Sequence, residues 1–128
     1  MLKITLTLSA LYLAIIGIAI MAVPTQFGVG AVPPDASVQL IALLRLLGGP
    51  FLGIAVLNWL SRSAQPSTLR AVLLANIVGF GAVASNDIIG IATGHSRDLA
   101  KLFVIFHVLF TAAFIAVLRR TRRTIPVT

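Results

Sequence analysis

The stretch SVQLIALLRLLGGPFLGIAVLNWL, residues 37–60, contains a single charged side chain, Arg45. A helix crosses the hydrocarbon core of a bilayer with about 20 mostly apolar residues, and this stretch meets that requirement. Three further stretches of the same character occupy residues 4–23, 69–91 and 99–118. Because the connections between them are short, the sequence predicts an all-α fold: one integral membrane domain over residues 1–128, with four transmembrane helices in an up-down antiparallel bundle.

The composition argues against a small soluble fold. Hydrophobic residues make up 59% of the chain and charged residues 10%, whereas soluble domains average about 25% charged residues. A soluble domain of 128 residues could not bury so much apolar surface. The chain has no Cys, which excludes disulfides, thiolate metal ligands and a Cys nucleophile.

The basic residues predict the topology. Two of them, Arg97 and Lys101, fall on one side of the predicted spans. The other side holds Lys3, Arg62, Arg70, Arg119, Arg120, Arg122 and Arg123. The positive-inside rule then places both termini in the cytoplasm. We expect the last four arginines, in a basic tail over residues 119–128, to contact anionic lipid headgroups. Nucleic-acid binding is not expected, because no aromatic residue is interleaved with this short cluster.

Two opposite charges lie inside predicted spans. With a rise of 1.5 Å per residue, Arg45 lies about 15 Å and Asp87 about 10 Å below the same boundary. An unpaired charge at the centre of a span costs about 2.5–3.5 kcal/mol on insertion scales. We therefore predict an intramembrane pair of Arg45 and Asp87. The pair is either a static clamp or a ligand or proton site; the remaining alternative is that Arg45 extends to the headgroups.

Other polar side chains are candidates for the same interior site. Tyr12 and His107 both fall near mid-membrane by the same helical rise. Asn86 adjoins Asp87 and could orient its carboxylate. Asn76, Phe80, Val83 and Asp87 recur at intervals of four, three and four residues, which predicts one inward face on the helix over 69–91.

Two features suggest how the helix over 37–60 packs. Pro50 removes the usual donor to the carbonyl of Leu46, so a kink is predicted at Gly49 and Pro50. Asn58 points away from the Arg45 face, at a depth similar to that of Asn76. A hydrogen bond between these two amides would contribute roughly 0.6–2 kcal/mol.

No arrangement of residues indicates catalysis. His95 lies in a predicted loop and His107 within the following helix, so the two cannot ligate one haem iron. Asp87 is the one carboxylate inside a span, too few for a di-metal carboxylate site. We expect neither an enzyme nor a metal site nor a cofactor, although the polar interior could hold a lipid or a quinone-like molecule.

The segment from Arg45 to Arg62, RLLGGPFLGIAVLNWLSR, resembles the second helix of a family of small, mostly uncharacterised four-helix bacterial membrane proteins. Such proteins often have Arg-Leu-Leu-Gly, an apolar segment, then Asn-Trp and a basic residue. Pro50 departs from that pattern, which more usually has a small residue there. The resemblance implies a four-helix bundle in the cytoplasmic (inner) membrane of a bacterium, and it implies no activity.

Two functions remain open at this point. The first is a non-catalytic accessory or assembly subunit of a larger membrane complex, with other membrane proteins and lipids as partners. The second is a small carrier or binding protein for a lipophilic or anionic ligand, in which Arg45 and Asp87 form the binding site.

Overall fold

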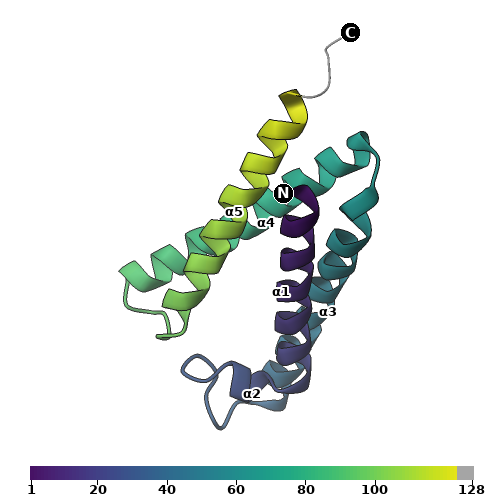
Figure 1. Cartoon of the computed structure of the whole chain (residues 1–128). Helices are drawn as coiled ribbons and strands as arrows, with labels where there is room; N and C mark the ends of the chain where they lie inside the picture. The colour runs from purple at the N-terminus through teal and green to yellow at the C-terminus, as the bar shows by residue number, and fades with distance from the viewer. Residues whose placement is uncertain (124–128) are drawn as a thin grey trace. The chain divides into compact units, whose positions relative to one another are not determined.

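The structure, a computed structural model, describes residues 1–123 apart from the side chains of Pro66, Arg122 and Arg123. This part of the chain is helical and forms no strand. The elements are α1 (Leu2–Ala22), α2 (Pro24–Phe27), α3 (Val38–Leu60), the 3-10 helix η1 (Ser61–Ser63), α4 (Pro66–Ala92) and α5 (Ala100–Arg123) (Figure 1). Four helices, α1, α3, α4 and α5, are long and apolar enough to cross a membrane. The predicted all-helical chain with four long apolar helices is therefore confirmed, and it indicates a multi-pass membrane protein.

Proline and glycine mark the ends of several helices. Pro24 begins α2 and Pro66 begins α4, positions where the missing N–H costs no helical hydrogen bond. Gly30 and Gly94 adopt positive φ angles of 82° and 71° in the two longer connections, a conformation that L side chains disfavour. The short helix α2 in the first of these connections was not predicted from the sequence.

The structure extends α5 beyond its predicted end. The basic tail was expected from residue 119, whereas α5 continues through Arg123. Arginine is a strong helix former. The rest of the predicted tail, residues 124–128, lies outside the described residues. Helix α3 continues across Pro50, and the kink predicted there stays a prediction.

Contacts divide the chain into two units. The N-terminal unit is Leu6–Leu60, and the C-terminal unit comprises Met1–Thr5 together with the chain from Ser61 onward. In the N-terminal unit, Ser9 on α1 contacts Asn58 on α3. Further along α1, Gly17 contacts Gly48, which lies earlier on α3. The order of these contacts shows that α1 and α3 pack antiparallel.

The C-terminal unit is built on the pairing of α4 with α5. Phe80 on α4 packs against Phe114 on α5, and Asp87, further along α4, contacts His107, earlier on α5. These helices are therefore antiparallel as well. Most of the buried side chains on these two helices are apolar, namely Leu69, Val72, Leu73, Phe80, Ala84, Phe114, Val117 and Leu118. This apolar packing holds the polar groups of the two helices at fixed relative positions.

Candidate functional site

The candidate site lies where α4 and α5 bring one acid and one base together. Asp87 follows Phe80 by seven residues and Ala84 by three, so the three side chains share one face of α4. Phe80 and Ala84 are buried, and Asp87 is half-buried. On α5, His107 precedes the fully buried Phe114 by seven residues. The packing of Phe80 against Phe114 therefore brings Asp87 and His107 into the same interface.

The carboxylate of Asp87 and the imidazole of His107 are in direct contact. Nδ1 of His107 lies 2.6 Å from Oδ2 of Asp87, and the exposed fractions of these side chains are 13% for His107 and 15% for Asp87. With an ionised carboxylate, Nδ1–H is the donor and Oδ2 the acceptor. Hydrogen bonds to a charged partner are roughly twice as strong as neutral ones. The contact thus joins α4 to α5 inside the apolar part of both helices.

Aromatic rings border the imidazole. The ring of Phe103, one turn earlier on α5, stacks against His107 with centroids 6.3 Å apart, and the ring of Phe80 lies 6.1 Å away. The guanidinium carbon of Arg97 lies 5.4 Å from the centroid of Phe103. A cation, a phenyl ring, an imidazole and a carboxylate therefore follow one another from the α4–α5 connection into the helix pair. The rings lower the local polarity, which strengthens the hydrogen bond beside them.

The contact between Asp87 and His107 links two helices and offers few groups for a metal ion. Within residues 1–123 no group of three or more His, Cys, Asp or Glu side chains is placed to hold a metal ion. Asp87 and His107 supply two ligating groups, whereas protein zinc sites use three or four. The pair links α4 to α5 through one hydrogen bond.

The other predicted site residues are spread over both units. Arg45 is exposed on α3 and Tyr12 is half-buried on α1, both in the N-terminal unit. Asp87 belongs to the C-terminal unit, so the Arg45–Asp87 pair stays a prediction. Asn86 is exposed beside Asp87. Asn76 is buried and donates a hydrogen bond from Nδ2 to the carbonyl of Val72 at 2.9 Å.

The predicted inward face of α4 needs one change. Asn76 and Phe80 are buried as expected, but Val83 is 38% exposed and Ala84 is buried in its place. The intervals of three and four residues fit either choice at this point. A small side chain on a buried face lets neighbouring helices approach closely, which favours Ala84 at this point.

A second polar contact joins α1 and α3. Asn58 donates from Nδ2 to Oγ of Ser9 at 3.1 Å, and both side chains are fully buried. Sequence reasoning identified Asn58 but missed Ser9. The available signal was the spacing of Thr5 and Ser9, two polar residues one turn apart in an apolar run. The predicted Asn58–Asn76 hydrogen bond would join the two units and stays a prediction.

Two glycines set the approach of α1 to α3. A Cβ atom added at Gly48 would lie 2.6 Å from the carbonyl oxygen of Gly17, closer than real Cβ contacts occur. A Cβ atom added at Gly49 or at Gly53 would meet nothing within 4 Å. Of these three glycines of α3, Gly48 is therefore the one that lies close to α1.

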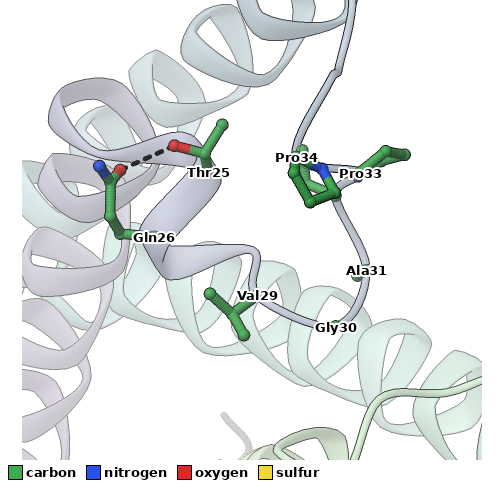
Figure 2. A pocket seen from close by; sticks show the side chains of 8 residues that line it. Thr25, Gln26, Val29, Gly30, Ala31, Pro33 and Pro34 are labelled. Carbon is green, nitrogen blue, oxygen red and sulfur yellow. Dashed lines mark hydrogen bonds between the residues drawn. The ribbon is translucent and has the colours of Figure 1, made fainter.

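A hollow lies in the connection between α1 and α3. It has a volume of about 650 Å³, and Figure 2 shows Thr25 and Gln26 on one side of it and the loop through Pro34 on the other. The hydroxyl of Thr25 donates to Oε1 of Gln26 at 2.8 Å. The remaining lining residues are Val29, Gly30, Ala31, Val32, Pro33 and Pro34. The described lining offers hydrogen bonds but no charge, so it provides no anchor for a charged ligand.

Comparison of the chain with protein-family models, with curated proteins and with solved structures found no match.

Proposed function

We propose that this chain is a non-catalytic accessory or assembly subunit of a larger membrane complex. The observation that supports the proposal is that every buried side-chain nitrogen and oxygen of the described residues has a hydrogen-bond partner. Two of the polar contacts, His107 to Asp87 and Asn58 to Ser9, each join two helices of one unit. Polar groups used in this way give the chain a defined shape, and they leave its apolar helix faces for lipid and for partner helices.

The proposal includes a topology and a location. The two antiparallel helix pairs assemble into one up-down four-helix bundle, with both termini in the cytoplasm. The resemblance of the segment from Arg45 to Arg62 supports the cytoplasmic membrane of a bacterium as the location. Cysteine accessibility labelling checks the orientation, because single cysteines introduced at Ser63 and Ser96 should be modified from opposite sides of the membrane.

The subunit role is tested by mild extraction of native membranes. A tagged full-length chain should co-purify with larger membrane proteins at a fixed stoichiometry, as measured by mass spectrometry. A harsh detergent that dissociates complexes is the control, and it should release the chain alone. A monodisperse, partner-free chain after mild extraction would contradict the proposal.

A carrier for a lipophilic or anionic ligand is the second candidate. It is favoured by the partial exposure of the Asp87 and His107 side chains, because a small ligand could exchange hydrogen bonds with them. Arg45 would supply a cation for a carboxylate or a quinone-type oxygen. In that case a bound molecule co-purifies with the isolated chain, and Arg45→Ala removes it while the helix content stays constant. Retention of the molecule by the Arg45→Ala variant would exclude this function.

A further inference from the structure

A groove runs along one face of α5 near its carboxyl end. It has a volume of about 430 Å³ and is lined by Ala112, Ile115, Ala116, Arg119 and Arg120. The lining residues are three or four positions apart and form two neighbouring rows on the helix surface. At 1.5 Å per residue, the face from Ala112 to Arg120 extends for about 12 Å along the helix axis. One row consists of Ala112, Ala116 and Arg120, and its two alanines leave space on the helix surface. The other row consists of Ile115 and Arg119, so each row ends in an arginine.

The groove combines an apolar floor with two cations at one end. Arg119 and Arg120 are exposed beyond the last apolar residues of α5, and Ile115 and Ala116 are half-buried. The dipole of α5 contributes about half a negative charge at this end, so two guanidinium groups leave a clear positive excess. An amphipathic anion, with its charge beside an apolar chain, matches this distribution.

The other described cations of α5 and of the connection before it have partners of their own. Lys101 forms an ion pair with Asp98 at 3.0 Å, and the guanidinium of Arg97 lies over the ring of Phe103. The opposite end of α5 therefore lacks the combination found at Arg119 and Arg120. An anionic lipid should distinguish the two ends of the same helix.

We propose that this groove binds one anionic phospholipid. The phosphate lies against Arg119 and Arg120, whose planar guanidinium groups match the oxygens of a phosphodiester. An acyl chain follows Ala112, Ile115 and Ala116 toward the middle of α5. The site goes beyond the subunit role proposed above, because it requires a membrane-embedded chain but no partner protein.

The test uses the full-length chain in mild detergent with native mass spectrometry. Phosphatidylglycerol is the anionic probe, and phosphatidylethanolamine of the same chain length is the probe without net charge. We expect the wild type to retain one phosphatidylglycerol and the Arg119→Gln/Arg120→Gln variant to bind it about thirtyfold more weakly, because each basic residue near the surface contributes about a factor of five. The matched control, Arg62→Gln/Arg70→Gln, removes two cations elsewhere and should bind like the wild type. Equal weakening by both double variants would overturn the proposal.

Two further measurements distinguish binding of a whole lipid from binding of a free anion, and they keep the proposal testable if a variant misfolds. Glycerol phosphate and inorganic phosphate should not displace the lipid at equal concentration, because neither fills the groove. Displacement of the lipid by either compound would show that the site binds an anion but no acyl chain, and it would overturn the proposal. Ala112→Leu keeps both arginines and fills the groove, so it should also weaken phosphatidylglycerol binding. If the arginine variant fails to fold, unchanged binding by Ala112→Leu would refute the groove.

Discussion

The imidazole Nδ1 of His107 lies 2.6 Å from the carboxylate Oδ2 of Asp87, in a helix interface composed mainly of apolar residues. This contact connects α4 and α5 at a point that Phe80 and Phe114 already hold in register. The acid and the base are 20 residues apart in sequence. Their meeting therefore depends on the antiparallel packing of two helices rather than on any local motif.

The first prediction concerns the stability of this contact. Asp87→Ala removes the acceptor and leaves the His107 N–H inside an apolar interface, which should destabilise the chain by about 1–3 kcal/mol. Asp87→Asn keeps an oxygen acceptor and should cost less. Unfolding in mixed micelles with increasing dodecyl sulfate measures the difference. Asp98→Ala is the control, since its exposed ion pair with Lys101 should contribute little. Equal stability of Asp87→Ala and the wild type would show that the contact does not form in the membrane.

A second prediction tests the pair inferred from sequence. If Arg45 and Asp87 neutralise each other in the bundle, Arg45→Gln strands the carboxylate of Asp87, at a cost of about 2.5–3.5 kcal/mol on insertion scales, and Asp87→Asn leaves the guanidinium of Arg45 without its anion. The double variant should then be less destabilised than the sum of the single variants. A double-mutant cycle measures this coupling. Strictly additive effects would show that Arg45 and Asp87 do not interact. Arg62→Gln, combined with Asp87→Asn, is the control cycle.

The third prediction addresses the buried hydrogen bond between α1 and α3. Ser9→Ala and Asn58→Ala should each destabilise the chain, with a coupling of about 0.6 kcal/mol and an upper value near 1.7 kcal/mol, as found for hydrogen bonds between membrane helices. The exposed amide of Asn86 provides the comparison, because Asn86→Ala should leave the free energy of unfolding nearly unchanged. Zero coupling between positions 9 and 58 would contradict the observed bond.

Neighbouring glycines on α3 supply the fourth prediction. Gly48→Ala places a methyl group 2.6 Å from the carbonyl oxygen of Gly17, and it should destabilise the chain by about 1–3 kcal/mol through overpacking. Gly49→Ala makes the same chemical change where nothing lies within 4 Å. Its effect should be neutral, or stabilising by up to about 1 kcal/mol from helix propensity. The same unfolding assay compares the two variants, and the reverse order of stability would refute the α1–α3 packing described above.

The apolar pattern predicted the helices more completely than it predicted their ends. A transmembrane helix is recognisable locally, because about 20 consecutive apolar residues suffice to span the bilayer. The ends of a helix depend on smaller contributions to the free energy. Helix α5 continues through Arg123 because arginine has a high helix propensity, and α2 forms in a connection where Pro24 is accommodated in the first turn. Such terms amount to a few tenths of a kcal/mol per residue, too small to decide from sequence alone.

The candidate site was only partly accessible to sequence reasoning. Helical rise gives the depth of a side chain, and depth alone placed Arg45, His107 and Asp87 at comparable levels. It does not give the rotation of each helix about its own axis. The same uncertainty explains why Val83 was expected where Ala84 is buried, and why Ser9 was overlooked as the acceptor for Asn58.

By itself, the sequence determined that the chain forms four long apolar helices and that several polar groups lie within them, because hydropathy and helical rise are local properties. Only the tertiary structure decided which faces meet: Gly48 against Gly17, Asn58 against Ser9 and Asp87 against His107. Those choices follow from the fit of two helix surfaces, where a shift of a single position exchanges a close contact for a clash or an open space. The energy of that fit is shared between distant segments, so neither segment specifies it alone.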